Sequence, residues 1–258
     1  MNILFFGDEY GVKQAFRFIP SKWFCGIVMA SNRPQYHKKI KIFAGKKKIK
    51  LLLQPLRTSN AYKKFFLDVK KIKPDLLLVH SYSMIIKNDI LKIPRLGGLN
   101  IHASLLPKYR GCNPIEWAII NNEKKTGVTL HKLTAKLDSG EILSQLNTSI
   151  KISETWKDIN QKIIVLTEKI LKKAARLIEQ KKLNGVAQER KKATYYPRRK
   201  PSDAEINWSW SALKIYNFIR AQVPPHHSAW CRRKNGDIKY FKKIVPIKKI
   251  KKIKKYFT

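Results

Sequence analysis

Short apolar runs and stretches of helical spacing alternate through the first two thirds of the chain. Runs with the length and composition of buried strands occur at residues 3–6, 26–29, 51–53, 75–80, 98–102, 128–133 and 142–145. Residues 61–72 repeat their apolar positions at helical spacing, and residues 113–120 add an N-cap at Asn113 and a proline in the first turn. This alternation predicts an α/β fold, with a Rossmann-like, mostly parallel sheet and helices on both of its faces.

The pattern changes near residue 184. Before it, residues 155–183 carry an apolar stripe over many helical turns, which predicts a long helix packed on the sheet. After it, the chain is rich in proline, polar residues and aromatics until helical spacing returns at residues 209–222. We therefore predict a first domain of residues 1–183 and a small C-terminal extension, with a basic tail, of residues 184–258.

The last segment, IKKIKKIKKYF, is the basic tail of this extension. It places Ile247, Ile250, Ile253 and Tyr256 three residues apart. As a helix it has an apolar stripe flanked by lysines, a pattern that can lie on anionic lipid. The other interpretation is a solvated basic tail. The excess of lysine along the whole chain favours the solvated tail, with at most a weak contact to an anionic surface.

The net charge restricts the class of partner only loosely. The 258 residues hold 55 Lys and Arg against 17 Asp and Glu, a formal net charge of +38. Such a charge attracts nucleic acid, anionic membranes and phosphorylated substrates. However, 43 of the cations are lysines spread over the whole length, whereas dedicated phosphate sites favour the fork geometry of arginine. Compositional drift is therefore the favoured interpretation.

The remaining composition indicates a soluble, cytoplasmic protein. Cys25, Cys112 and Cys231 are widely spaced and form no CxxC pair, which argues against a disulfide framework. The apolar start of the chain is too short for a signal peptide, and no apolar run approaches a membrane span. No set of His, Cys and carboxylate residues has metal-ligand spacing, so we expect no metal.

The segment GDEYG after the first strand lacks the GxGxxG pattern of dinucleotide-binding turns, which argues against binding of NAD.

The segment LNIHASLLPKYRG carries the candidate chemistry. On a strand, Asn100 and His102 leave the same face, while their apolar neighbours point into a core. Asp138 ends a second apolar segment, directly before a Ser-Gly turn. An amide for a developing oxyanion, a histidine to move a proton and an aspartate to orient them suit acyl transfer. Two further histidines, His80 and His131, are expected to pack or to bond locally.

Several strings in this region resemble the catalytic core of the 10-formyltetrahydrofolate-dependent formyltransferases. They are NIHASLLPKYRG, then Pro114 and Trp117, then TGVTLHKL and LDSGEILSQ. The resemblance runs from Met1 to about Arg220. It implies that Asn100 stabilises the oxyanion, that His102 acts as base or second donor, and that Asp138 stabilises the protonated histidine or takes the amine proton through water. The amine then attacks the formyl carbon directly, through a tetrahedral intermediate.

The resemblance also implies where the two substrates bind. The formyl donor, 10-formyltetrahydrofolate, is expected against Met84, Ile85 and Ile86, against Thr134, Leu137 and Asp138, and against Leu105, Leu106 and Pro107. The acidic acceptor is expected against Lys108, Tyr109 and Arg110 and against Tyr196 and Arg198. Two departures from the family pattern leave the chemistry intact: Cys112 replaces an arginine of some sugar-modifying relatives, and PPHHSAW replaces a P-x-P-G-A-aromatic string.

The identity of the acceptor amine is open to more than one hypothesis. The segment YYPRRKPSD is similar to the PRR-x-P-x-D segment of nucleotide-sugar N-formyltransferases. This similarity predicts a nucleotide-linked amino sugar as the acceptor and a role in lipopolysaccharide biosynthesis. Sugar-modifying relatives are often homodimers, although no feature of this sequence demonstrates a dimer. We favour this first hypothesis.

The alternatives rest on charge and on the shared core. The second hypothesis is a methionyl-tRNA formyltransferase, which suits the positive charge. Members of that family resemble a longer chain with a separate C-terminal barrel and a long basic loop. The segment SNRPQYHKK matches this loop only in part. A relative that merely deformylates the cofactor usually carries an extra N-terminal domain. A noncatalytic basic protein that binds nucleic acid needs no Asn, His and Asp set.

Overall fold

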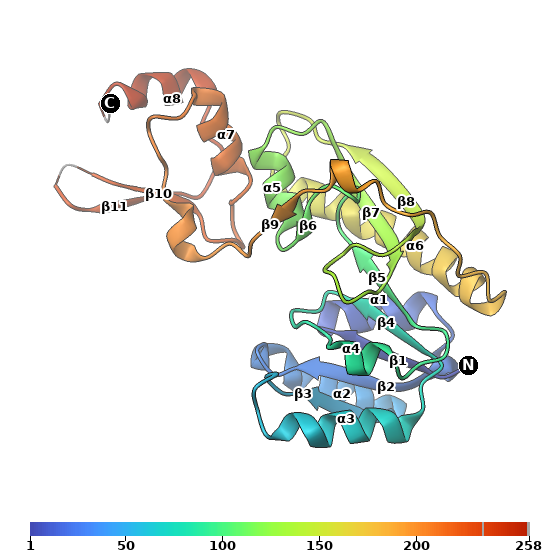
Figure 1. Ribbon diagram of the computed structural model, residues 1–258. Helices are drawn as coiled ribbons and strands as arrows, with labels where there is room; N and C mark the ends of the chain where they lie inside the picture. The colour runs from blue at the N-terminus through green and yellow to red at the C-terminus, as the bar shows by residue number, and fades with distance from the viewer. Residues whose placement is uncertain (234, 257–258) are drawn as a thin grey trace. The chain divides into compact units, whose positions relative to one another are not determined.

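The computed structural model describes residues 1–233 and 235–256 of the chain (Figure 1). These residues form two compact units, and the chain passes between them several times. The first unit holds Met1–His102, Val128–Gln145 and Thr167–Glu189, and the second holds Ala103–Gly127, Leu146–Leu166 and the residues from Arg190 onward. The chain passes into the second unit for the last time after Glu189. The domain boundary predicted at residue 183 lies a few residues earlier and stays a prediction.

A seven-stranded sheet is built mainly from the first unit, in the order β3-β2-β1-β4-β5-β7-β8. Its strands are β1 (Ile3–Gly7), β2 (Phe24–Ala30), β3 (Leu51–Gln54), β4 (Leu76–His80), β5 (Gly98–His102), β7 (Lys125–Lys132) and β8 (Ile142–Ser149). The strands from β3 to β5 are parallel, and β7 runs antiparallel to β5. β1 and β4 are buried along their whole length, which explains their continuous apolar runs. The mostly parallel sheet expected from the sequence is therefore confirmed.

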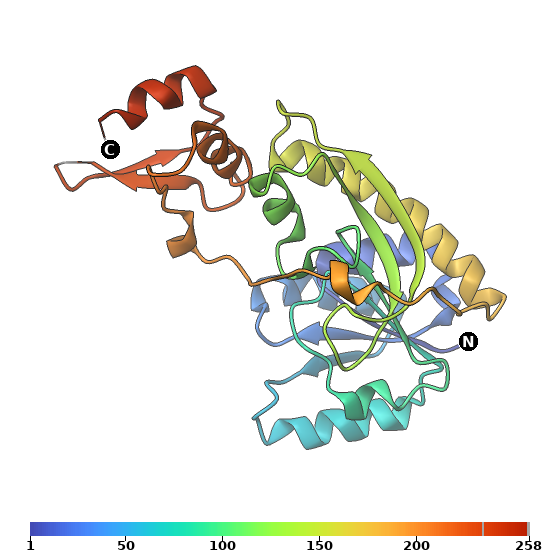
Figure 2. The same ribbon diagram turned by 45° about the horizontal axis from the view of Figure 1, so that its top comes forward.

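Helices cover both faces of this sheet, as the sequence predicts (Figures 1 and 2). They are α1 (Glu9–Phe18), α2 (His37–Lys47), α3 (Ala61–Ile72), α4 (Asn88–Leu91) and the long α6 (Trp156–Glu179), with short 3-10 helices at Ser21–Trp23 and Pro34–Tyr36. On one face, Phe65 of α3 belongs to the same buried cluster as Phe6 of β1. On the other, Phe5 of β1 contacts Phe24, on which Phe16 of α1 stacks with ring centroids 3.9 Å apart. Successive residues of one strand thus anchor helices on opposite faces.

The second unit contains shorter elements. They are β6 (Arg110–Gly111), α5 (Pro114–Ile120), β9 (Tyr195–Tyr196), α7 (Ala212–Arg220), β10 (Ala229–Arg232), β11 (Ile238–Phe241) and α8 (Ile247–Lys254), with 3-10 helices at Arg190–Lys192 and Pro201–Ala204. β6 pairs with β9 in parallel, and β10 pairs with β11 antiparallel. The predicted side-chain cap of α5 is wrong. Asn113 has left-handed backbone (φ 53°), and its side-chain amide donates to Glu116 instead.

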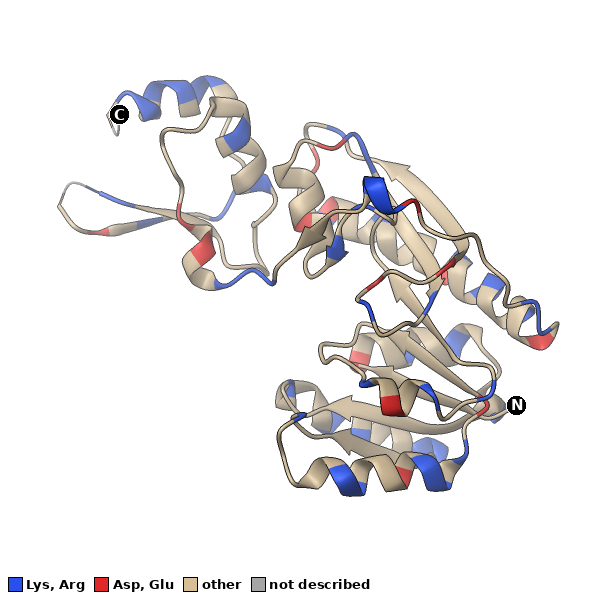
Figure 3. Cartoon of the chain, in the orientation of Figure 1, with Lys and Arg blue, Asp and Glu red and all other residues tan. Residues whose placement is uncertain are grey.

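The basic C-terminal segment forms the packed helix α8. Ile250 is 1% exposed, and Nζ of Lys254 donates to the carbonyl oxygen of Trp210 at 2.8 Å. Its exposed lysines are Lys248, Lys249, Lys251, Lys252 and Lys255. Figure 3 shows that lysine and arginine also occur on most other elements of both units. Most lysines of α8 are therefore exposed, whereas Ile250 packs inside the second unit. The weak contact of this segment with an anionic surface stays a prediction. Among the described residues, no helix has both the length and the apolar character needed to cross a membrane.

Candidate active site

Strands β5 and β7 bring the first candidate residues together in the first unit. Their antiparallel register pairs Asn100 with His131 and His102 with Thr129. Successive side chains of a strand point to opposite faces, so these four residues lie on one face of the sheet. The apolar residues that alternate with them on β5 are buried in the core. The strand pattern predicted for Asn100 and His102 therefore has the geometry that the chemistry needs.

Asp138 faces both histidines from the turn that follows β7. Its Oδ2 lies 3.6 Å from Nδ1 of His102, and its Oδ1 lies 3.6 Å from Nε2 of His131. Nδ2 of Asn100 donates to Oδ1 at 3.3 Å. Asp138 is 9% exposed, His102 7% and His131 1%, so salt and water screen these interactions weakly. The structure thus brings Asn100, His102 and Asp138 into one group, in which His102 and Asp138 are buried and Asn100 is half-buried.

His131 is a member of this group that sequence reasoning missed. Its Nδ1 donates to the carbonyl oxygen of Lys132 at 2.8 Å, which leaves the lone pair of Nε2 to accept from Nδ2 of Asn100 at 3.1 Å. His131 therefore orients the amide of Asn100. The alternation of TGVTLHKL carries the signal, but only the register with β5 shows what His131 faces. Within the described residues, no cluster of three His, Cys, Asp or Glu side chains is suited to hold a metal ion.

Two of the side chains predicted for the formyl donor are exposed apolar groups of the first unit. Ile85, in the loop after β4, is 55% exposed, and Leu137, directly before Asp138, is 48% exposed. The backbone of the loop is fixed, because Nε2 of Gln54 donates to the carbonyl oxygen of Ile85 at 3.0 Å. Exposed aliphatic side chains on ordered loops suit contact with a flat heteroaromatic ring.

The other residues predicted for the donor have less uniform surroundings. In the first unit, Met84 and Ile86 are half-buried, with Ile86 packed against the core, and Thr134 is exposed. In the second unit, Leu105 and Pro107 are half-buried, but Leu106 is 3% exposed. The side chain of Leu106 is therefore a core residue of its own unit.

The residues predicted for the acceptor lie in the second unit, where they contact one another. The rings of Tyr109 and Tyr196 stack with centroids 4.9 Å apart, and Trp117 contacts Tyr196 at 5.0 Å. The hydroxyl of Tyr109 donates to Glu123 at 2.9 Å, and Lys108 forms an ion pair with the same carboxylate at 3.3 Å. The ring of Tyr196 thus already has two aromatic neighbours, so it contributes to the packing of the second unit.

Two cations of this cluster differ in exposure. Arg110 is 4% exposed and donates to the hydroxyl of Tyr195, whose ring lies 5.2 Å from the guanidinium. Arg198 is exposed, and so is Tyr195, at 55%. The solvent-facing members of the cluster are therefore Lys108, Tyr195 and Arg198, of which Tyr195 was not among the residues predicted for the acceptor.

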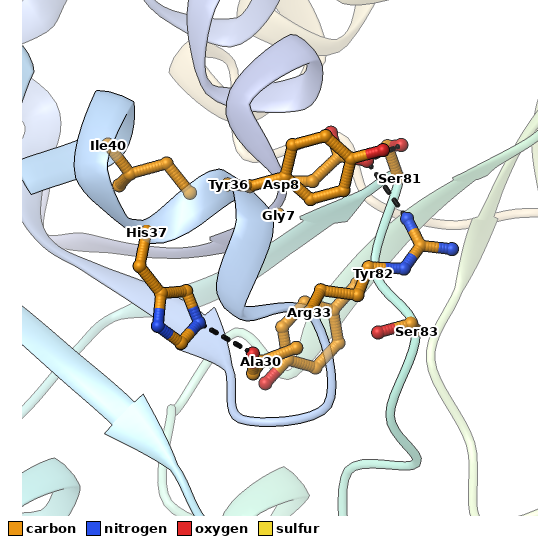
Figure 4. Close-up of a pocket in the computed structure, with 10 residues that line it drawn as sticks. All are labelled: Gly7, Asp8, Ala30, Arg33, Tyr36, His37, Ile40, Ser81, Tyr82 and Ser83. Atoms are coloured by element: carbon orange, nitrogen blue, oxygen red, sulfur yellow. Dashed lines mark hydrogen bonds and ion pairs between the residues drawn. The ribbon is translucent and has the colours of Figure 1, made fainter.

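A small pocket lies where the strand order reverses, at the carboxyl ends of β1 and β4 (Figure 4). Asp8 accepts from the backbone N–H of Gly11 at 3.0 Å, at the start of α1. It also accepts from Arg33 at 3.0 Å and from Ser81 at 2.7 Å. Such switch points bind ligands in α/β folds, and helix N-termini attract anions. Here the carboxylate of Asp8 already takes the place of an anion, so we expect no phosphate at the start of α1.

Comparison with known proteins gives consistent sequence matches. Residues 27–175 match the family model described as formyl transferase, and residues 198–253 match the one described as formyl transferase, C-terminal domain. The chain is 32% identical to a methionyl-tRNA formyltransferase of Acetivibrio thermocellus over 232 residues, which cover 87% of this chain and 74% of that protein. It is 44% identical to the bifunctional polymyxin resistance protein ArnA of Wigglesworthia glossinidia brevipalpis, over 63% of this chain. The chain spans only 25% of the length of ArnA. It is also 38% identical to a methionyl-tRNA formyltransferase of Alkaliphilus oremlandii, over 61% of this chain and 51% of that protein.

Solved structures share the fold at low sequence identity. A 4-N formyltransferase from Francisella tularensis and a sugar N-formyltransferase from a Shewanella species both superpose with a TM-score of 0.76. Their identities to this chain are 18% and 16%, and each comparison covers 95% of this chain and 98% of the other. At these identities, the comparison bears on the fold alone.

Proposed function

This chain belongs to the formyl transferase family, and we propose that it transfers a formyl group from 10-formyltetrahydrofolate to the amino group of a nucleotide-linked amino sugar. Membership of the family makes the protein an enzyme of formyl transfer. The hypothesis of a noncatalytic protein that binds nucleic acid is therefore excluded. The acceptor and the roles of the individual residues are the proposed part.

The group around Asp138 carries the proposal for the chemistry. Formyl transfer needs a neutral amine, a donor for the oxygen that gains negative charge, and an acceptor for the proton that leaves the nitrogen. Asn100, His102 and Asp138 supply these functions within contacts of 3.3 to 3.6 Å. Catalytic hydrogen bonds are often long before substrates bind and tighten afterwards.

Asn100 is proposed as the hydrogen-bond donor to the formyl oxygen. Both of its amide N–H bonds have partners, Nε2 of His131 at 3.1 Å and Oδ1 of Asp138 at 3.3 Å. The longer of these bonds is the weaker one. We propose that the substrate oxygen replaces Asp138 as the partner of this N–H, while His131 continues to hold the amide in position.

His102 is proposed as the group that accepts the amine proton. Its Nδ1 faces Oδ2 of Asp138, and with the proton on Nδ1 the nitrogen that takes the amine proton is Nε2. The imidazolium formed in this step is stabilised by the carboxylate beside it. Burial of the pair strengthens this attraction, because the effective dielectric constant is lower than in water. The imidazolium then returns the proton to N10 of the donor, as the bond between N10 and the formyl carbon breaks and tetrahydrofolate leaves.

Two exposed apolar side chains are proposed as contacts for the formyl donor. We propose that Ile85 and Leu137, which are 55% and 48% exposed, hold the pterin ring of 10-formyltetrahydrofolate together with the backbone of their loops. When bound, this group supplies the formyl carbon. The solved neighbours include a sugar 3N-formyltransferase described in the presence of dTDP and 5-N-formyl-THF, which supports a folate donor.

A nucleotide-linked amino sugar is supported as acceptor by two solved neighbours and by the exposed cluster of the second unit. One neighbour is a sugar 3N-formyltransferase described in the presence of dTDP, and the other is an N-formyltransferase from Helicobacter canadensis described in complex with dTDP-3-aminofucose. Tyr195 and Arg198 are exposed, an aromatic ring and a guanidinium of the kinds that bind a base and a phosphate. A role in lipopolysaccharide biosynthesis, a cytoplasmic location and a homodimer stay predictions.

Two observations favour tRNA as the second candidate acceptor. The methionyl-tRNA formyltransferase of Acetivibrio thermocellus matches this chain over 74% of its own length. In addition, residues 190–258 contain 20 Lys and Arg against three Asp and Glu, a charge that suits a polyanion. The sugar remains the proposed acceptor, and the experiment below separates the two.

The test is a turnover assay with purified protein and 10-formyltetrahydrofolate, followed by the spectral change on release of tetrahydrofolate. The acceptors are nucleoside-diphosphate 3-amino and 4-amino sugars and methionyl-tRNA. Turnover with an amino sugar alone is expected, and turnover with methionyl-tRNA alone would overturn the proposal. With the active acceptor, Asn100→Ala is expected to lower kcat by about a hundredfold to a thousandfold, the usual cost of losing an oxyanion donor.

A further inference from the structure

Asp138 lies in a turn with an unusual backbone. Its φ is +48°, in the left-handed region that a residue with a Cβ occupies at a cost of about 1 kcal/mol or more. Gly140, two residues later, lies so close to β7 that an added Cβ would be 2.0 Å from the carbonyl oxygen of Lys132. The turn is therefore pressed against β7 on one side and needs contacts that hold its backbone on the other.

Gln188 supplies such contacts. Its Nε2 donates to the carbonyl oxygen of Asp138 at 2.9 Å and to that of Gly140 at 2.7 Å. One amide group therefore binds the backbone on both sides of Ser139. These bonds involve the residue that carries the catalytic carboxylate, although Gln188 lies 50 residues away in the chain.

The segment that carries Gln188 is itself fixed to the start of β8. Val186 and Ile142 form an antiparallel bridge, with backbone hydrogen bonds of 2.8 and 2.9 Å. The backbone N–H of Gly185 donates to Glu141 at 3.3 Å, and Glu141 also forms an ion pair with Lys132 at 2.8 Å. Gln188 thus reaches the turn from a fixed position, a requirement for a side chain that positions another.

We propose that Gln188 is a positioning residue for formyl transfer, which holds the turn so that the carboxylate of Asp138 faces His102 and His131. The proposal rests on the catalytic role proposed above for Asp138. Misplacement of a reacting group by about 1 Å costs about a hundredfold in rate. Loss of the two hydrogen bonds is therefore expected to lower kcat by between about tenfold and a hundredfold.

The first experiment compares Gln188→Met with the wild-type chain. Methionine has nearly the same length and lacks both N–H donors. With the acceptor that the wild type uses, kcat is expected to fall as stated, while KM for the acceptor is unchanged. Gln188→Lys, whose ammonium can donate to both carbonyl oxygens, is expected to restore most of kcat. Gln180→Met is the matched control, because Gln180 is exposed after the end of α6. All variants are assayed well below their melting temperatures.

The second experiment distinguishes positioning from a general structural role. The substitution Gln188→Met is repeated in Asp138→Asn, where no further loss of kcat is expected if Gln188 acts through Asp138. An equal loss in both backgrounds, or a wild-type kcat in Gln188→Met, overturns the proposal. A wild-type kcat in Asp138→Asn instead removes the catalytic role of Asp138 and the proposal with it. Failure of the sugar assay leaves this comparison intact, because it uses whichever acceptor is active.

Discussion

Single residues set the chemistry of the first unit, and His131 acts there through a neighbour. The amide of Asn100 has two hydrogen-bond partners, of which His131 is the nearer, at 3.1 Å. The tautomer of His131 is set by the carbonyl oxygen of Lys132, so the imidazole presents a lone pair to the amide. His131 is therefore expected to determine the direction in which Asn100 donates.

The first prediction concerns the substitution His131→Ala. It is expected to lower kcat for formyl transfer by about tenfold, less than loss of the oxyanion donor itself, because Asn100 remains but loses the partner that orients it. Steady-state kinetics check this, with His227→Ala, an exposed histidine of the second unit, as control. An unchanged kcat would mean that Asp138 alone orients Asn100.

His80 is a residue of the fold with no proposed part in the chemistry. It ends β4, and its Nε2 lies 2.9 Å from Oε1 of Gln14. Burial lowers its pKa to about 4, because the charged ring loses its water, and the nearby Asp8 opposes this effect only in part. The unfolded chain has a pKa near 6.5 at this residue and binds the proton more readily. Stability is therefore complete above pH 6.5 and is lost as the pH falls towards 4.

The second prediction concerns the free energy of unfolding as a function of pH. His80 is expected to contribute a loss of about 2 kcal/mol between pH 7.5 and pH 5, at 1.36 kcal/mol per pKa unit. In His80→Gln this part of the loss is expected to be absent. Burial also lowers the pKa of His226, and this contribution remains in both proteins. Urea unfolding at pH 7.5 and pH 5 measures the difference, and equal pH dependence in the two proteins would contradict it.

At the level of elements, periodicity predicted the strands of the sheet and the helices α3 and α6, but not α2 or α4. β4 and β5 are apolar runs of the expected length, and the alternation of Asn100 and His102 on β5 is sufficient to assign their face. Asp138 could be assigned to the same candidate site because its turn follows an apolar strand. These features are local in the sequence, and each follows from the period of a single element.

The parts that periodicity did not predict depend on pairing between distant segments. His131 joins the site only through the register of β7 on β5, and Gln188 only through the bridge of its segment to β8. The cap expected at Asn113 failed for a similar reason, since Glu116 and the backbone of Arg199 engage both ends of its amide. Such contacts have no period that a sequence pattern can show.

The third prediction concerns helix α8 of the second unit. Ile250 is 1% exposed, so Ile250→Ala is expected to destabilise this unit by about 2–4 kcal/mol, through lost burial and the cavity left behind. Lys251→Ala, on the solvated face of the same helix, is expected to change stability by less than about 0.5 kcal/mol. Tryptophan fluorescence follows the unfolding, because five of the six tryptophans lie in the second unit. Similar effects of the two substitutions would mean that α8 is not packed.

At the level of the whole molecule, the charge of +38 is spread over both units (Figure 3). A spread of lysines attracts any polyanion through release of counterions, without recognising its sequence or its aminoacyl group. Binding of tRNA is therefore expected whichever acceptor the enzyme uses. Binding of tRNA by itself therefore does not support tRNA as the acceptor. The dependence of this binding on salt and on the aminoacyl group does distinguish the two acceptors.

The fourth prediction uses this dependence. At 50 mM salt, the protein is expected to bind methionyl-tRNA, uncharged tRNA and an unrelated RNA of the same length with similar affinity. At 200 mM salt, all three affinities are expected to fall together by about a thousandfold or more, as for a protein that contacts many phosphates. Filter binding at the two salt concentrations measures this. A selective affinity for methionyl-tRNA that persists at 200 mM salt would instead require a specific site for the acceptor stem, and would favour tRNA over the amino sugar as substrate.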